Sequence, residues 1–116
     1  MTDMMMNFSN QERISTMRLS WEIFYADSRE APQEIDRAFH IIMKQRGIDT
    51  EITLEQAIDI VKKMPSDKKI NVQCLLVKTV SVDGQIVPKK NECWDNITAK
   101  CDLLKIDAVK VVEYPF

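Results

Sequence analysis

Glycine is scarce in this chain, which has only Gly47 and Gly84 among its 116 residues. All-β domains need many tight turns, and those turns favour glycine or Asn-Gly pairs, so the scarcity argues against a sandwich or a barrel. It also excludes the glycine-rich loops that bind phosphate in P-loop and dinucleotide-binding proteins. These exclusions favour a fold built from helices.

Other features are missing as well. The only histidine is His40, and no nucleophile–base pair is visible, so we do not expect an enzyme. Lys and Arg number 16 against 18 Asp and Glu, and this net charge of −2 gives no general attraction to nucleic acid. No stretch reaches the ~18 apolar residues of a membrane span, and no secretory signal is visible.

The cysteines, Cys74, Cys93 and Cys101, are odd in number and form no Cys-x-x-Cys pair. Each lies at an apolar position of a helical pattern, where a free cysteine behaves as a small hydrophobic residue. Disulfides are rare in reducing compartments. We therefore interpret the three as reduced core thiols of a cytoplasmic protein.

The first helix is predicted to begin after Ser9, whose spacing from Glu12 is that of a capping box. Apolar residues then recur every three to four positions and widen into a broad face, so this helix is expected to be central. The residues on that face are Ile14, Met17, Leu19, Trp21, Ile23, Phe24 and Ala26. We interpret residues 1–9 as a flexible leader and residues 10–116 as a single helical domain.

Proline, glycine and capping signals delimit the next two helices. Pro32 fits the first turn of the second helix, and Gly47 fits its C-terminal stop. Thr53 and Gln56 have the spacing of another capping box, which predicts the start of a third helix. Pro65 ends that helix.

The fourth helix is predicted over roughly residues 67–82, with Ser66 or Asp67 as its cap. It is apolar nearly all round, so we expect it to be the most buried helix, with Leu75 and Leu76 both largely buried.

A fifth helix follows Pro88 and carries one apolar stripe, formed by Trp94, Ile97, Cys101 and Leu104. Residues 106–116 are interpreted as a short helix. Their valines also suit an edge strand, which is the alternative.

A shift of 56 residues aligns the first half of the chain with the second. The same order recurs in each half: an apolar helix, an aspartate turn at Asp27 or Asp83, a proline five residues later, and an amphipathic helix. We therefore expect an all-α, compact bundle of five to six helices with an approximate internal two-fold repeat of helical hairpins.

The two aspartate turns are the only candidate chemical site. Asp27 and Asp83 lie near helix C-termini, where the helix dipole disfavours an acid. A bound cation is one explanation, with Glu30 or Glu34 and then Glu92 as further ligands, and such oxygen ligands suit Ca²⁺ or Mg²⁺. The alternative is ordinary turn chemistry, because aspartate commonly bonds its own backbone in turns.

Residues 26–34 (ADSREAPQE) and 82–88 (VDGQIVP) resemble the inter-helix turn of TerB-like (tellurite-resistance protein B-like) domains, which typically reads Ala-Asp-Gly-x-Ile-x-x-x-Glu. The resemblance covers roughly residues 11–105. It implies a helical bundle with approximate two-fold symmetry, metal binding by acidic residues, and membership of stress-response or membrane-linked complexes.

The resemblance also implies a set of metal ligands. Asp27, Glu34 and Asp83 match the family's motif, whereas Glu92 matches only approximately because Lys90 stands at the position of the family's glutamate.

These observations predict a non-catalytic helical interaction module of TerB-like type, with a divalent cation bound at its acidic turns. Its partner would be another protein or a second copy of the chain. The alternative is a purely structural interaction or homodimerisation domain, without metal, in which the acidic turns are only turns.

Overall fold

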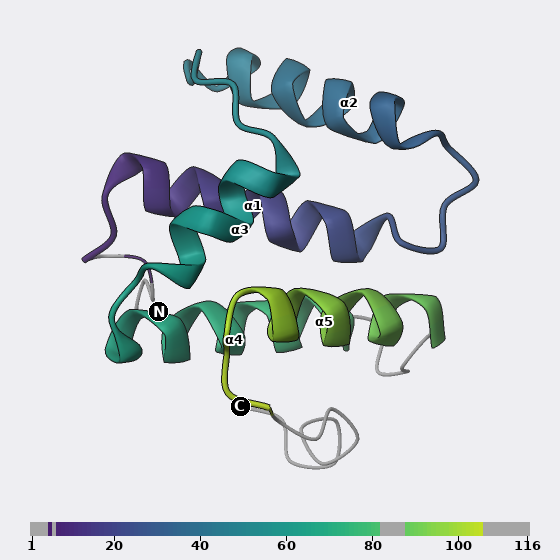
Figure 1. The fold of residues 1–116 in the computed structure, drawn as a ribbon. Coiled ribbons are helices and arrows are strands. Elements are labelled where there is room, and N and C mark those ends of the chain that lie inside the picture. Colours follow the sequence, from purple (N-terminus) through teal and green to yellow (C-terminus); the bar gives the residue numbers. More distant parts are fainter. Residues whose placement is uncertain (1–4, 6, 82–87, 106–116) are drawn as a thin grey trace.

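The computed structural model describes residues 5, 7–81 and 88–105, and this part of the chain forms five helices and no strand (Figure 1). They are α1 (Asn10–Phe24), α2 (Pro32–Gln45), α3 (Leu54–Lys62), α4 (Ser66–Val80) and α5 (Pro88–Lys100). The all-α class is confirmed. The predicted turn at Asp83 and the predicted helix in the tail lie outside the described residues. No helix in the described part of the chain has both the length and the apolarity to cross a membrane.

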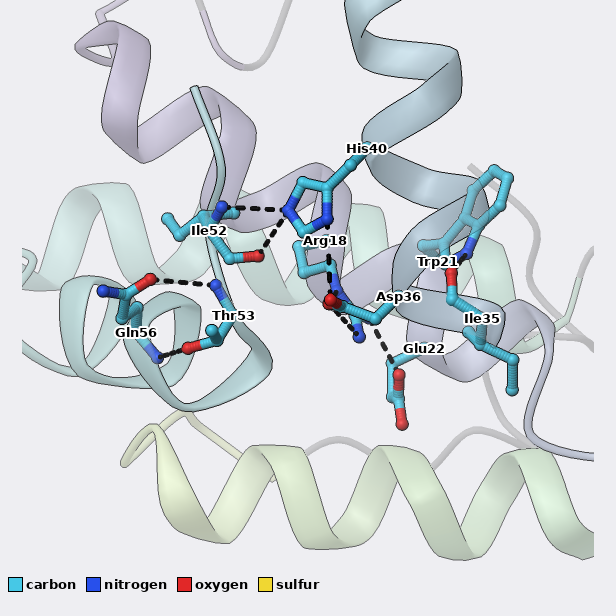
Figure 2. A network of polar contacts seen from close by, with 9 residues as sticks. All are labelled: Arg18, Trp21, Glu22, Ile35, Asp36, His40, Ile52, Thr53 and Gln56. Atoms are coloured by element: carbon cyan, nitrogen blue, oxygen red, sulfur yellow. Dashed lines mark hydrogen bonds and ion pairs between the residues drawn. The ribbon is translucent and has the colours of Figure 1, made fainter. Parts of the chain in front are cut away.

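Both predicted capping boxes are present. The Glu12 N–H donates to Ser9 Oγ over 3.2 Å, and the Ser9 N–H donates to Glu12 Oε1 over 2.8 Å. Thr53 and Gln56 make the equivalent pair of bonds at 3.1 and 2.9 Å (Figure 2). Pro32 is the first residue of α2, where its missing N–H leaves no hydrogen bond unmade. Local sequence signals therefore set the starts of three helices.

Gly47 ends α2, as its sequence predicts. It has a φ of +82°, and the Ile48 N–H donates to Met43 O over 2.9 Å, which is the bond of a Schellman motif. Asp102 takes the corresponding position after α5 with a φ of 56°. This left-handed conformation is common for glycine and costs an aspartate conformational energy.

The predicted cap of α4 is wrong. Helix α4 begins at Ser66, and its N-cap residue is Pro65, which makes no side-chain cap bond. Pro65 has an extended backbone, with φ −68° and ψ 161°. Pro65 therefore occupies the N-cap position. Ser66 lies inside the helix, where its side chain cannot cap the N-terminus.

Helix α1 lies in the middle of the molecule, as expected (Figure 1). Helix α3 crosses it, α2 lies on one side, and α4 and α5 lie on the other. Two groups of buried apolar side chains surround α1. The smaller consists of Ile14, Phe39, Met43 and Ile52, and the larger of Phe8, Leu19, Ile23, Ala57, Val61, Met64, Val72, Leu76, Val77, Val80, Trp94, Ile97, Cys101 and Leu103. Phe8, within the segment interpreted as a leader, belongs to this core.

Helix α4 is not buried all round, contrary to the prediction. Leu76 is fully buried, whereas Leu75 is only half-buried and Ile70 is 53% exposed. The reason is that α4 packs on α1, α3 and α5 over only part of its circumference. Leu104, predicted on the buried stripe of α5, is 67% exposed because the chain reverses at Asp102 before reaching it.

A buried amide joins α4 to α5. Gln73 is 1% exposed, and its Oε1 accepts a hydrogen bond from Trp94 Nε1 at 2.8 Å. Its Nε2 donates to Thr98 Oγ1 at 3.1 Å and to the Leu104 carbonyl at 2.6 Å. A buried polar group is tolerated when its hydrogen bonds are made, so this network fixes the position of α5 without leaving an unpaired donor.

The helix bounds follow the 56-residue shift. Helices α1 and α4 both contain 15 residues, and they begin at residues 10 and 66. Helices α2 and α5 begin at Pro32 and Pro88. The local order of elements is therefore the same in both halves. A two-fold axis relating them stays a prediction.

Candidate interaction groove

A groove of about 510 Å³ lies between α1 and α4, and we refer to it as the α1–α4 groove. Most of its lining is apolar, although it is open to solvent. Its residues are Met5, Thr16, Met17, Ser20, Trp21, Phe24, Tyr25, Leu75, Lys78 and Thr79. Apolar side chains gathered at an open groove are a common feature of protein-binding sites.

Two hydroxyl groups in the lining are already bonded. Thr16 Oγ1 donates to the Glu12 carbonyl at 2.9 Å, and Thr79 Oγ1 donates to the Leu75 carbonyl at 3.0 Å. Each threonine therefore uses its hydrogen on its own helix. These two hydroxyls therefore have no hydrogen left to donate to an occupant.

An aromatic wall forms one side of the groove. Trp21 Nε1 donates to the Ile35 carbonyl at 3.0 Å, a bond that holds the indole against α2 (Figure 2). The Trp21 and Tyr25 rings lie 4.7 Å apart, and the Tyr25 and Phe24 rings 5.0 Å apart. Because the rings support one another, the wall is ordered before any partner binds, which lowers the entropic cost of binding.

Phe24 is the most unusual member of this wall, because a large apolar side chain is 46% exposed there. Lys90 Nζ lies 4.9 Å from the centre of its ring, in the geometry of a cation–π contact, and Lys90 itself is only 7% exposed. Lys78 also lines the groove. No carboxylate is among the described residues that line the groove.

A polar network of α1 and α2 residues lies close to Trp21 (Figure 2). The Arg18 guanidinium is 3% exposed, bonds Glu22 at 2.8 Å and contacts Asp36 at 3.2 Å. It also lies 5.7 Å from the centre of the Phe39 ring. A buried guanidinium needs such partners, and here they join α1 to α2 next to Trp21.

His40 belongs to this same network and has partners on both sides. Its Nδ1 lies 3.5 Å from Asp36 Oδ2, and its Nε2 lies 3.0 Å from both the N–H and the carbonyl of Ile52. With the proton on Nδ1, the ring donates toward Asp36 and accepts from the Ile52 N–H. His40 therefore ties α2 to the segment before α3.

The predicted metal ligands are placed only in part. Asp27 is exposed just after α1, Glu34 is exposed in the first turn of α2, and Glu92 is exposed on α5. Asp83 lies outside the described residues. Within the described part of the chain, no three His, Cys, Asp or Glu side chains gather closely enough to hold a metal ion. The proposed ligand set needs Asp83, so it stays a prediction.

A second cleft, of about 530 Å³, brings α5 close to the first acidic turn. Its lining includes three carboxylates, those of Glu22, Glu30 and Glu92, together with the lysines Lys89 and Lys100. Two lysines beside three carboxylates leave little net negative charge for a cation.

The cysteines do not supply a reactive thiol to this cleft. Cys93 lines it, but burial, followed by the nearby Glu22 carboxylate, raises the pKa of its thiol to about 11. Burial also raises the pKa of Cys101 to about 11. Both thiols stay protonated at neutral pH and are therefore poor nucleophiles.

No family model, curated protein or solved structure matches this chain. The sequence predicts Met17, Trp21 and Phe24 on the apolar face of a central helix. The sequence feature that points to the groove is the broad apolar face of α1. A helix with two apolar stripes has more apolar surface than the helices on one side of it can bury, so part of that surface stays exposed.

Proposed function

We propose that this chain is a non-catalytic interaction module that binds a protein partner in the α1–α4 groove. The observation that carries the proposal is the exposed ring of Phe24 on a preordered aromatic wall. Fully burying a phenylalanine side chain is worth about 1.5–3 kcal/mol, so a partner that covered the 46% of Phe24 that is exposed would recover about half of that free energy. Aromatic side chains are also enriched among the residues that dominate binding energy.

Residue-specific photo-cross-linking tests this function. A photoreactive phenylalanine analogue replaces Phe24 in the full-length chain, expressed in its native host. The matched control places the analogue at Ile41, which is 52% exposed on α2 and does not line the groove. We expect a defined cross-linked protein from position 24 and none from position 41. Equal labelling from both positions, or none from either, would contradict the proposal.

The TerB-like resemblance and the two-fold repeat belong to the same proposal. Matching bounds of α1 and α4, and matching starts of α2 and α5, support a duplicated helical hairpin. A homodimer is the alternative occupant of the groove. Sedimentation velocity across a range of concentrations distinguishes the two, because a homodimer must dissociate on dilution whereas a module for another protein stays monomeric.

A weak divalent-cation site is a second candidate function. Glu92 lines one cleft with Glu22 and Glu30, and this cleft also includes Ala26 and Ser28, the residues on either side of Asp27. A cation that binds only the folded chain must raise its melting temperature, and Asp27→Asn should abolish that rise while leaving the cation-free melt unchanged. Several millimolar Ca²⁺ or Mg²⁺ that leave the wild-type melt unchanged would exclude the site.

A further inference from the structure

His40 faces a carboxylate on one side and a backbone peptide group on the other (Figure 2). On the second side, its Nε2 lies 3.0 Å from the backbone nitrogen of Ile52 and 3.0 Å from the Ile52 carbonyl oxygen. A ring nitrogen either accepts a hydrogen bond or donates one, so Nε2 bonds only one of these two groups at a time. The protonation state of Nε2 decides which group that is.

The neutral ring has one favoured tautomer. With the proton on Nδ1, the ring donates toward Asp36 Oδ2 at 3.5 Å, and Nε2 accepts from the Ile52 N–H. The other tautomer would turn the Nδ1 lone pair toward the carboxylate and would leave the Ile52 N–H facing a second donor. The carboxylate is itself held in place, because Arg18 Nε donates to Asp36 Oδ1 at 3.2 Å. Nε2 is therefore the atom that gains a proton on acidification.

We infer that His40 is a pH-operated switch, which exchanges the backbone group that ties α2 to the connection between α2 and α3. The neutral ring accepts from the Ile52 N–H. The protonated ring donates from Nε2 to the Ile52 carbonyl, and the Ile52 N–H then loses its acceptor. Nδ1 carries its hydrogen beside Asp36 in both states, so the ring stays in position and only the bond to Ile52 changes.

The charged groups around the ring come from three parts of the fold. The pocket beside His40 is lined by α2 and the connection, and its α3 residue, Gln56, is uncharged. Asp36 contacts the ring, so the protonated ring has an opposite charge beside it. The acids around the ring are Asp36, Asp49 and Glu51, and the bases are Arg37 and Lys44 in the pocket lining and Arg18 on α1.

The bond that changes lies at a constrained point of the chain. Ile52 is 4% exposed and belongs to the core cluster of Phe39 and Met43. The next residue, Thr53, is the N-cap of α3. A backbone N–H that loses its acceptor at a buried residue is costly. Protonation should therefore perturb the connection at Ile52 and leave α2, which holds the ring, unchanged.

Hydrogen exchange measured by NMR on the full chain tests this switch. Histidines in general change charge between pH 5 and 8, so the two states are compared at these limits. Protection is the slowing of exchange relative to the unfolded chain at the same pH. We expect the Ile52 amide to lose about ten-fold in protection at pH 5. The Ile48 amide, which donates to Met43 O at 2.9 Å in the same connection, is the matched control and should keep its protection.

Three results of this measurement overturn the inference. The first is equal protection of the Ile52 amide at both pH values. The second is an equal loss at Ile48, which would mean that the whole connection loosens in acid. The third is a neutral ring that carries its proton on Nε2, as the nitrogen chemical shifts of the imidazole would show.

Variants assign the effect to His40. His40→Gln removes the titrating group and should make the protection of Ile52 independent of pH, whereas the control Glu51→Gln should keep the wild-type loss. A folded His40→Gln that retains the pH dependence overturns the inference. If circular dichroism shows that His40→Gln is unfolded, the wild type decides, because the Ile52 amide and the His40 ring must then titrate with one midpoint. Different midpoints overturn the inference. None of these measurements involves the α1–α4 groove, so the proposed function and this inference fail separately.

Discussion

Lys68 Nζ lies 2.9 Å from Glu12 Oε1, and the two residues are 56 positions apart, the same shift that aligns the starts of α1 and α4. The pair joins the first turns of these two helices. Residues that would be equivalent under an internal two-fold repeat are thus direct neighbours, which happens only close to the axis of such a repeat. Glu12 also belongs to the capping box of α1, so a single carboxylate serves both the start of its helix and the contact with α4.

The Glu12 contacts predict a dependence of stability on acid. The Ser9 backbone N–H and then Lys68 hold the pKa of Glu12 below its usual 4.5. A lowered pKa means that the stabilisation is present above about pH 4.5 and is lost as the pH falls through the lower, folded-state value. Glu12→Gln keeps the capping geometry but not the charge. We expect its melting temperature to fall less than that of the wild type between pH 5 and 3, and parallel curves would contradict this.

Leu75 and Leu76 are neighbours in sequence but differ in burial, and their alanine variants should differ accordingly. Leu76→Ala should lower the free energy of unfolding by about 2–5 kcal/mol, because it leaves a cavity in the core. Leu75→Ala, at the groove, should cost clearly less, since the space it leaves is open to solvent. Urea unfolding measures both. Similar losses would show that the groove wall is part of the core.

The two left-handed residues that follow helices predict opposite effects of substitution. Asp102→Gly should raise the stability by up to about 1 kcal/mol, because glycine adopts a φ of 56° without the cost borne by aspartate. Gly47→Ala should lower it by about 1 kcal/mol. An added Cβ at Gly47 would meet nothing within 4 Å, so that loss would report backbone conformation alone. Thermal melts of both variants, compared with wild type, check the signs.

The raised thiol pKa values predict slow alkylation. With pKa values of about 11 in place of 9.0, Cys93 and Cys101 have about 100-fold less thiolate in the folded chain than when unfolded. Iodoacetamide at pH 8 should therefore label both much more slowly in the native chain than in urea, as mass spectrometry would show. The same shift makes the native state lose stability as the pH rises from about 9 toward 11. A melting temperature that stays constant over this range would contradict it.

Much of the fold could be predicted because its signals are local. Ser9 and Thr53 act through bonds to residues three positions away, Pro32 and Gly47 act through their own backbone conformation, and all four mark helix bounds as expected. Burial was harder to predict, because it depends on which face of a helix finds a neighbour. Leu75 and Ile70 have the same apolar character as Leu76, and only the packing of α4 on α1, α3 and α5 distinguishes them.

The candidate site was predicted less well than the fold. Acidic residues in turns stood out in the sequence because they are chemically distinctive, whereas an apolar groove consists of residue types that also build cores. Phe24 continues the apolar spacing of Met17 and Trp21, so periodicity alone assigns it to the interior. Its exposure follows from the absence of a covering helix at that point among the described residues.

The two tryptophans differ in their exposure to solvent, so their fluorescence reports on two different parts of the protein. Trp94 is buried, and its indole is bonded to the Gln73 amide, so its emission should be blue-shifted and resistant to acrylamide. Trp21 is only partly buried and borders the α1–α4 groove. An occupant would shield Trp21 from the quencher and leave Trp94 unchanged. Quenching of the intrinsic fluorescence should therefore separate into two components: the Trp21 component reports whether the groove is occupied, and the Trp94 component reports whether the chain is folded.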